Sequence, residues 1–455
     1  MSDTPLPTSR REFLKDSGRL AAASALAGVA LPAVHAAEGN TIQLALVGCG
    51  GRGTGAIADA LHTKAGPVKL VAMADVFPGR LSSSLANLQG QFAAMVDVPG
   101  DRQFVGFDAY QKAMACLKPG DIAVLGTPSA FRWVHFGEAV GRGLNVFMEK
   151  SLVVDGPGAR RFLATADESV KKGLKVGVGL MCRHCKARQE LQRRIQDGQL
   201  GDILTMRCYR MHGPAGVVGP RPQGENELLF QVRNFHGFPW AGGGFYVDWL
   251  IHNIDECCMM KGAWPVRAQG SGGRQDRGIH VDQNFDHYTV EYTFADGSKL
   301  FAEARGVANC HNEFASYAHG TKGLAVISSV AHSPARCRIY KGHNQVKDEL
   351  AWSFPPDEPN PYQLEWDDLM AAIRGDKPYN EARRGAEASL VAVMGRHACH
   401  TGKVVTFEEM LKHAVALSPG VEKFTTSSPA PVTAGPDGKY PLPRPGAHPD
   451  REYAG

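Results

Sequence analysis

Short runs of apolar residues alternate with amphipathic stretches through the first 180 positions of the chain. An apolar run without polar alternation is typical of a strand buried on both faces, as in a parallel sheet covered by helices. The predicted strands are 42–47, 68–74, 121–126, 145–148 and 174–179, and the predicted helices are 81–92, 107–116, 135–143 and 158–172, besides one that follows the first strand. The alternation predicts an α/β domain over 41–180 with a doubly wound parallel sheet.

The second half of the chain has a different pattern, in which one predicted helix, 187–196, precedes strand-like runs with wide, irregular connections. The predicted strands are 203–209, 266–270, 288–294, 299–303, 325–328 and 336–340, with helices at 361–373 and 384–400. Ala295-Asp296-Gly297 is a hairpin turn signal. This pattern predicts a second α/β domain over 181–410 with a large, mainly antiparallel open sheet. The Pro- and Gly-rich tail, 418–455, is predicted to be either an extended arm or disordered.

The first predicted strand leads into a glycine-rich turn, Gly48-Cys49-Gly50-Gly51-Arg52-Gly53. Gly48, Gly50 and Gly53 fit the G-x-G-x-x-G pattern, in which missing Cβ atoms let the backbone approach a pyrophosphate. The helix that follows would direct its N-terminal N–H groups at that phosphate. The pattern alone is weak in a chain with 52 glycines, but its place between a strand and a helix favours a dinucleotide site over a turn that serves packing only.

Asp75 ends the second predicted strand, 22 positions after Gly53. A carboxylate there can accept hydrogen bonds from the ribose hydroxyls of an adenosine. It would repel a 2′-phosphate, and the next residue is Val76 rather than an arginine that could pair with one. Asp75 therefore favours NAD over NADP. Two further strand ends, Thr127-Pro128 and Glu149-Lys150-Ser151, place polar groups at the same edge of the sheet.

Composition excludes several classes of protein. The chain has 50 basic and 46 acidic residues, a net charge of +4 that is too balanced for a nucleic-acid binder. Beyond the N-terminus, no apolar run reaches the roughly 20 residues that a spanning helix needs. The ten cysteines have no regular spacing and are predicted to be scattered thiols rather than a disulfide framework. Cys182 and Cys185 have metal-ligand spacing, but no matching second pair follows, so no metal site is predicted.

The first 37 residues are interpreted as an export signal. Ser9-Arg10-Arg11-Glu12-Phe13-Leu14-Lys15 matches the twin-arginine pattern, and an apolar segment at 20–31 precedes small residues before a cleavage point at Ala37. The alternative is a basic, disordered tail. Twin-arginine export carries folded proteins, typically with a cofactor in place, so the signal and the dinucleotide site support each other. Together they predict a periplasmic or otherwise exported protein, with the Tat export machinery as a partner and no stable membrane span after cleavage.

Gly242-Gly243-Gly244 opens the second informative stretch. On a helix that follows, Asp248, His252 and Asp255 have an i, i+4, i+7 spacing and share one face. A carboxylate one turn from an imidazole can orient it and raise its basicity, as a general base requires. Spacing alone does not separate this catalytic pair from a helix-capping acid beside a packed histidine.

In their order and spacing, the strand–GCGGRG–helix unit, Asp75, Glu149-Lys150 and the glycine-led Asp248-x-x-x-His252 resemble the glucose–fructose oxidoreductase / inositol dehydrogenase family, Gfo/Idh/MocA. The resemblance covers roughly residues 41 to 405. It implies an N-terminal Rossmann domain and a C-terminal α/β domain for substrate binding and oligomerisation, whose open sheet commonly forms a dimer interface, and so a homodimer or homotetramer. Two positions depart from the family pattern. Ser151 replaces the usual proline after the lysine, and the segment after Thr127-Pro128 lacks the histidine commonly found there.

The resemblance implies that Lys150, Asp248 and His252 occupy the positions of the family's catalytic trio. His252 is the candidate base, Asp248 its orienter and Lys150 the cation that stabilises the developing alkoxide, although lysine and histidine could exchange the base role. The candidate cofactor-binding residues are Gly48, Gly50, Gly51, Arg52, Gly53, Asp75, Thr127, Pro128, Glu149 and Lys150. Candidates for a polyol pocket are Arg183, Tyr209, His236 and Trp240, each of which is singly more typical of a surface or structural residue.

The leading hypothesis is an exported NAD-dependent oxidoreductase that acts on a sugar or cyclitol hydroxyl. Because the periplasm is not expected to supply free NAD, such an enzyme should hold its cofactor tightly and reset it in each cycle. A second hypothesis is a redox-neutral glycosidase, as some members of the family are, which oxidises C3 transiently, eliminates the glycosidic substituent and re-reduces the product. A third is a non-catalytic Rossmann binding protein, and the retention of all three catalytic residues counts against it.

Overall fold

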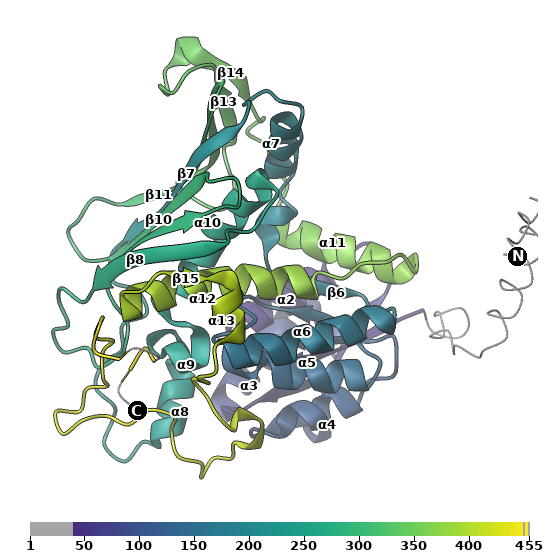
Figure 1. The fold of residues 1–455 in the computed structure, drawn as a ribbon. Helices are drawn as coiled ribbons and strands as arrows, with labels where there is room; N and C mark the ends of the chain where they lie inside the picture. Colours follow the sequence, from purple (N-terminus) through teal and green to yellow (C-terminus); the bar gives the residue numbers. More distant parts are fainter. Residues whose placement is uncertain (1–39, 449–450, 454–455) are drawn as a thin grey trace, which may run out of the picture.

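The computed structural model describes residues 40–448 and 451–453 (Figure 1). The predicted twin-arginine segment lies outside the described residues, as does the rest of the predicted signal. In the view of Figure 1, a nine-stranded sheet lies above a six-stranded sheet, and helix α12 (Ala382–Thr401) runs between them. Across residues 40–448 and 451–453, the helices are all too short or too polar to cross a membrane.

The first sheet has six parallel strands in the order β3-β2-β1-β4-β5-β6. The strands are β1 (Ile42–Val47), β2 (Val68–Asp75), β3 (Gln103–Val105), β4 (Ile122–Leu125), β5 (Asn145–Met148) and β6 (Val176–Val178). This is the predicted doubly wound Rossmann topology, and the carboxyl ends of β1 and β4 border the crevice where the strand order reverses. The sequence pattern did not predict β3, because its three partly exposed residues form no apolar run.

Helices cover both faces of this sheet. One face carries α2 (Gly51–Leu61) and α3 (Pro78–Phe92) together with α11 (Pro361–Arg374), which comes from the second half of the chain. The other face carries α4 (Ala109–Ala115), α5 (Arg132–Gly141) and α6 (Gly156–Lys171). Trp366 of α11 stacks on Phe147 of β5 with ring centroids 4.4 Å apart, so α11 belongs to the core of the first sheet.

The second sheet has nine strands in the order β14-β13-β12-β11-β7-β10-β9-β8-β15, and the predicted mainly antiparallel sheet is confirmed. β10 pairs with β7 in parallel, and the other neighbouring pairs are antiparallel. The strands are β7 (Ile203–His212), β8 (Arg267–Gly273), β9 (His287–Thr293), β10 (Lys299–Gly306), β11 (Glu313–Gly320), β12 (Gly323–Ser329), β13 (Arg338–Tyr340), β14 (Leu350–Ser353) and β15 (Val405–Thr406). The sequence pattern missed β11, β14 and β15. β11 mixes small and polar residues, β14 is largely exposed and β15 has only two residues.

Helix α10 (Gly244–Lys261) is the centre of the second half. It packs against β7, β11 and α12 and is buried on every side. A helix buried all round carries its polar residues inside as well, so Asp248, His252 and Asp255 are all buried. The remaining helices of this half are α7 (Lys186–Gln196), α8 (Glu227–Arg233), α9 (Pro239–Gly242) and α13 (Phe407–Lys412), and the 3₁₀ turn η5 (Phe235–Gly237) precedes α9.

After α13, the chain forms an extended arm along the side of the molecule that carries α8 and α9 (Figure 1). Phe424 packs on Phe131 and Trp240 with ring centroids 6.3 and 6.2 Å apart, and the buried Tyr440 donates its backbone N–H to Val281. Of the two forms predicted for the tail, the described part has the extended arm. Buried aromatic anchors order a sequence whose composition alone is also typical of disorder.

Candidate active site

The turn after β1 approaches the turn after β4 at very short range. Gly48 has φ +95°, and a Cβ atom there would lie 2.6 Å from the backbone nitrogen of Thr127. A Cβ atom on Gly53 would lie 2.1 Å from the carbonyl oxygen of Gly48, so only glycine fits at either position. A Cβ atom on Gly50 would meet no atom within 4 Å. Packing therefore explains the first and third glycines of the pattern, whereas the second leaves open space beside the helix end.

The N-terminus of α2 offers unpaired N–H groups to that space. Gly50 is the N-cap, no side chain of the described residues caps the helix, and the first turn holds no acidic residue. The first N–H groups of a helix have no partner within it and lie at the positive end of its dipole. Gly50, Gly51 and Arg52 line the adjoining cleft. These features fit the pyrophosphate of a dinucleotide.

Asp75 holds this turn from the end of β2. Its Oδ2 accepts the N–H of Cys49 at 2.7 Å and its Oδ1 accepts the N–H of Phe77 at 2.9 Å. Burial raises the pKa of Asp75, and the two N–H groups oppose that rise. A carboxylate has about four lone-pair sites, so acceptor capacity remains for ribose hydroxyls, and Asp75 also lines the cleft.

Two of the predicted cofactor residues pair with each other across the mouth of the turn. Arg52 Nη2 lies 2.8 Å from Glu149 Oε1, and the Arg52 guanidinium lies 4.6 Å from the centre of the Tyr362 ring. Thr127 Oγ1 lies 3.0 Å from Nδ1 of the buried His135. Of the predicted cofactor residues, all but Gly53 line one cleft.

The cleft has a volume of about 1270 Å³ and extends from the glycine turn to Lys150, His236 and Asp248. Pockets for a single small molecule commonly measure roughly 300–1,000 Å³. The cleft therefore has room for an elongated dinucleotide with a small molecule at its far end.

A buried carboxylate organises that far end. Lys150 Nζ donates to the carbonyl oxygen of Asp248 at 2.6 Å and to its Oδ1 at 2.9 Å. The other carboxylate oxygen, Oδ2, lies 2.6 Å from Nδ1 of His236 in η5. Burial alone would raise the pKa of Asp248, but Lys150 and His236 outweigh it and hold this pKa below its ordinary value. An ionised carboxylate thus holds a cation and an imidazole side by side at the cleft.

His252 lies one turn further along α10 and has other neighbours. Its ring centroid lies 4.6 Å from that of His332, and its Nδ1 has no hydrogen-bond partner among the described residues. Burial, with His332 and Lys150 nearby, holds the pKa of His252 well below the ordinary histidine value. The predicted orientation of His252 by Asp248 is therefore wrong, because Asp248 contacts Lys150 and His236 while Nδ1 of His252 has no hydrogen-bond partner among the described residues. Helical spacing puts two side chains on one face, but the surrounding elements decide which partner each one meets.

Of the residues predicted for a polyol pocket, only His236 lines the cleft. Arg183 makes a bidentate ion pair with Asp255. Trp240 is buried and donates its indole N–H to Gln231. Tyr209 lies on the face of β7 opposite the buried Cys208, with its ring 6.3 Å from that of Tyr317. Arg183, Trp240 and Tyr209 thus have partners within the fold.

Cys182 and Cys185 are buried free thiols. In the part of the chain that the structure describes, no three His, Cys, Asp or Glu side chains are arranged to hold a metal ion.

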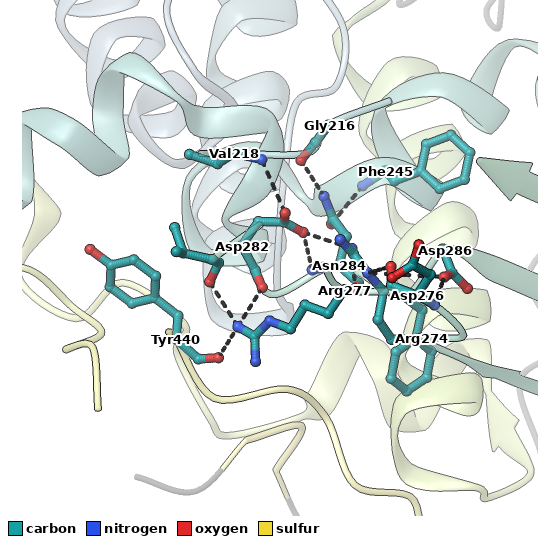
Figure 2. Close-up of polar contacts among 12 residues, drawn as sticks. Gly216, Val218, Phe245, Arg274, Asp276, Arg277, Asp282, Asn284, Asp286 and Tyr440 are labelled. Carbon is teal, nitrogen blue, oxygen red and sulfur yellow. Dashed lines mark hydrogen bonds and ion pairs between the residues drawn. The ribbon is translucent and has the colours of Figure 1, made fainter. Parts of the chain in front are cut away.

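The sequence pattern did not reveal the loop that fixes the start of α10. Asn284 Oδ1 accepts the N–H of Phe245, and Asn284 Nδ2 donates to the carbonyl oxygen of Gly216 (Figure 2). Nδ2 also donates to the carbonyl oxygen of His236 at 2.9 Å. Asp282 in turn accepts the N–H of Asn284. This loop therefore sets the position of His236 relative to the helix that carries Asp248, and no spacing within the sequence marks it.

Comparison with known proteins agrees with this architecture. Residues 188–326 match the family model of the GFO/IDH/MocA C-terminal domain. A "Glycosyl hydrolase family 109 protein" of Shewanella pealeana is 22% identical over 365 residues, which cover 74% of this chain and 72% of that protein. The aldose-aldose oxidoreductase of Caulobacter crescentus has a TM-score of 0.59 at 16% identity, over 80% of this chain and 99% of that one. The scyllo-inositol dehydrogenase of Lactobacillus casei, solved with NAD(H) and scyllo-inositol, has a TM-score of 0.57 at 19% identity, over 81% of this chain and 99% of that one.

At such identities the solved structures show the shared fold, and the family model adds the C-terminal domain. The chain therefore has the fold of the Gfo/Idh/MocA oxidoreductases, and within it residues 188–326 match their C-terminal domain.

Proposed function

We propose that this protein is an NAD-dependent oxidoreductase acting on a hydroxyl group of a sugar or cyclitol. One observation carries the proposal: a single cleft joins the glycine turn and Asp75 to the Lys150–Asp248 pair. The turn and the uncapped end of α2 would hold the pyrophosphate, and Asp75 would hold the adenosine ribose. When bound, the nicotinamide would supply the hydride acceptor.

Removal of the hydroxyl proton requires an unprotonated base, and a nearby cation stabilises the alkoxide that forms. Lys150 is held by Asp248 at the end of the cleft, where its ammonium would stabilise the alkoxide that develops on the substrate. His252 is the base in this proposal, because it lies one turn from Asp248 on α10 and its Nδ1 has no partner among the described residues. Such a group contributes about 10²–10⁴-fold to the rate.

His236 is the competing base. It lines the cleft, and its Nδ1 lies 2.6 Å from Asp248 Oδ2, which is the contact of an imidazole with an orienting carboxylate. The variants His252→Ala and His236→Ala separate the two assignments. Loss of turnover in His252→Ala with retained nucleotide supports the proposal, and the same loss in His236→Ala alone would transfer the role to His236.

The experiment that tests the function itself begins with purified, dialysed protein. Mass spectrometry of nucleotide released on denaturation identifies the cofactor. The native protein is then mixed with a panel of sugars and cyclitols, with and without added NAD, and the absorbance of reduced nicotinamide is followed. A protein that binds no nucleotide and oxidises no compound of the panel would contradict the proposal.

A redox-neutral glycosidase is the second candidate, favoured by the likeness to the glycosyl hydrolase family 109 protein. Transient oxidation at C3 acidifies the proton at C2, so that the glycosidic substituent can leave C1 by elimination. Water then adds to the resulting double bond at C1, and the C3 ketone is reduced again. A glycoside labelled with deuterium at C2 would lose its label to water during this reaction. Retained label beside a released ketone or lactone would favour simple oxidation.

We also propose that the protein is exported through the twin-arginine pathway with its cofactor already bound, on the strength of the Arg10-Arg11 pattern. Replacing both arginines with lysine should leave the precursor in the cytoplasm, and cell fractionation would detect it. Normal recovery of this double variant from the periplasm would remove the argument for a carried cofactor.

A further inference from the structure

Among the described side chains, Arg210 differs from the other cations around α10 because no carboxylate lies within ion-pair distance of it. Three neighbouring cations are neutralised in the pairs Lys150–Asp248, Arg188–Glu256 and Arg183–Asp255. Within residues 40–448 and 451–453, the Arg210 side chain makes one hydrogen bond, from Nη1 to Nε2 of His332 at 3.2 Å. Its Nε is buried without a partner.

The pleat of β7 directs Arg210 toward helix α10. Arg210 shares its face of the strand with Met206 and Cys208, which are buried, while Arg207 lies on the opposite face. The buried face packs against α10, the helix that carries Asp248 and His252. The Arg210 guanidinium lies 4.2 Å from the centre of the Phe314 ring, which holds the group in place without neutralising it.

His332 connects this cation to the proposed base. Its ring packs against His252 with centroids 4.6 Å apart, and its Nε2 accepts the hydrogen bond from Arg210. Burial, together with Arg210, holds the pKa of His332 well below the ordinary histidine value, so both imidazoles are neutral. Because Asp248 offsets Lys150, Arg210 contributes the one uncompensated positive charge of this cluster of described side chains.

We propose that Arg210 binds a carboxylate of the substrate, which makes the substrate class an acidic sugar, a uronic acid or its glycoside. The inference rests on the proposed function. A guanidinium with free N–H donors matches a carboxylate in bidentate geometry, and such charge-assisted pairs are strong in buried sites. One uncompensated charge suits a monoanion. A phosphate dianion would need a second cation that this cluster does not offer.

The test compares glucuronate, glucose and glucose 6-phosphate as substrates for the NAD-loaded protein. We expect the wild-type kcat/KM for glucuronate to exceed that for glucose by roughly tenfold or more. Arg210→Gln should abolish this preference and weaken glucuronate binding in isothermal titration by a similar factor. Arg207→Gln, on the opposite face of the same strand, should retain it. Arg210→Lys keeps the charge without the planar guanidinium and should give an intermediate preference. This variant separates the loss of the guanidinium from misfolding of Arg210→Gln.

The outcomes separate the two proposals. Oxidation of glucose and glucuronate at equal efficiency, or a preference that survives in Arg210→Gln, would overturn the acidic-sugar assignment and leave the oxidoreductase intact. A preference for glucose 6-phosphate would replace the carboxylate with a phosphate and so overturn the assignment as well. Glucuronate binding that depends on Arg210 without oxidation of any sugar would sustain the subsite and contradict the proposed function.

Discussion

The two ends of the cleft are built in different ways. At the cofactor end, the hydrogen bonds by which Asp75 holds the glycine turn join residues close together in sequence, although Arg52 and Glu149 pair across 97 positions. Asp75 meets Phe77 two positions away and Cys49 26 positions away. At the substrate end, Lys150 and Asp248 are 98 positions apart, and Asn284 meets the carbonyl oxygens of His236 and Gly216 over 48 and 68 positions. At the cofactor end, the short-range motif therefore specifies which residues hold the glycine turn and how they are arranged. The substrate end, in contrast, forms only when the whole second half of the chain is folded.

The largest expected effect is at the pair that joins the two halves. Lys150→Ala should lower kcat by about 10³–10⁴-fold, because it removes the cation that stabilises the alkoxide and leaves the Asp248 carboxylate buried beside His236 alone. Bound nucleotide, measured by mass spectrometry, should be retained, because the glycine turn is unchanged. Lys175→Ala is the matched control, since Lys175 pairs with the exposed Asp376 and should leave turnover near wild type. Loss of nucleotide in Lys150→Ala would show that the two ends are not independent.

The second prediction tests whether the substrate end depends on remote support. Asn284→Ala leaves the N–H of Phe245 and the carbonyl oxygens of Gly216 and His236 without their shared partner. We expect a loss of about 2–3 kcal/mol in the free energy of unfolding, with kcat reduced and nucleotide affinity unchanged. Urea unfolding measures the free energy of unfolding, and nucleotide titration measures the affinity. Asn344→Ala, an exposed asparagine, should alter neither. Weakened nucleotide binding in Asn284→Ala would contradict the division between the two ends.

The predictability of the molecule follows the same division. The order of elements and the glycine turn could be predicted from apolar runs and local spacing, because parallel strands buried on both faces and a Cβ-free turn leave a direct pattern in the sequence. Strand β11 could not be predicted, because it pairs with β7 across more than a hundred positions and its small, polar residues show no alternation of their own.

The same limit applies to the candidate site. The sequence marked Asp248 and His252, but the partner of Asp248 proved to be His236, which reaches it from the separate turn η5. Likewise, Arg183 was one candidate for a polyol pocket, and in the structure it pairs with the buried Asp255 of α10. The sequence pattern identifies a polar residue that will be buried. The fold decides with which other residue it pairs.

The third prediction tests the cofactor end alone. Asp75→Ser with Val76→Arg should shift the preference from NAD toward NADP by roughly 10–100-fold, because a repulsive carboxylate is replaced by a partner for the 2′-phosphate. The same change removes the acceptor of the Cys49 and Phe77 N–H groups, so some loss of affinity for both nucleotides is expected. Nucleotide titration gives the ratio. An unchanged ratio would show that another residue determines which dinucleotide is bound.

The smallest expected effect concerns buried histidines. Burial should lower the histidine pKa at both ends of the cleft, even though the contacts at the two ends arise from different patterns in the sequence. His135 at the cofactor end is buried, and burial with Arg132 nearby lowers its pKa to about 3. The unfolded chain has an ordinary histidine pKa of about 6.5. Between these values the unfolded chain binds a proton that the folded chain does not, so the free energy of unfolding falls as the pH decreases, by up to about 1.4 kcal/mol per pH unit. His135→Gln should remove this contribution, and urea unfolding at about pH 6.5 and about pH 5.5 should show roughly 1 kcal/mol less acid sensitivity than in wild type.

His252→Gln provides the comparison at the substrate end, because burial also holds the pKa of His252 well below the ordinary value. Its acid sensitivity should fall in the same direction. His311→Gln, whose side chain is 77% exposed, is the control for a general effect of losing a histidine. If only His135→Gln alters the acid sensitivity, the pKa of His252 in the folded protein lies close to the ordinary histidine value, and burial does not act equally at the two ends. A histidine with such a pKa is still a competent general base near neutral pH, so the choice between His252 and His236, which lines the cleft and contacts Asp248, depends on the two alanine variants.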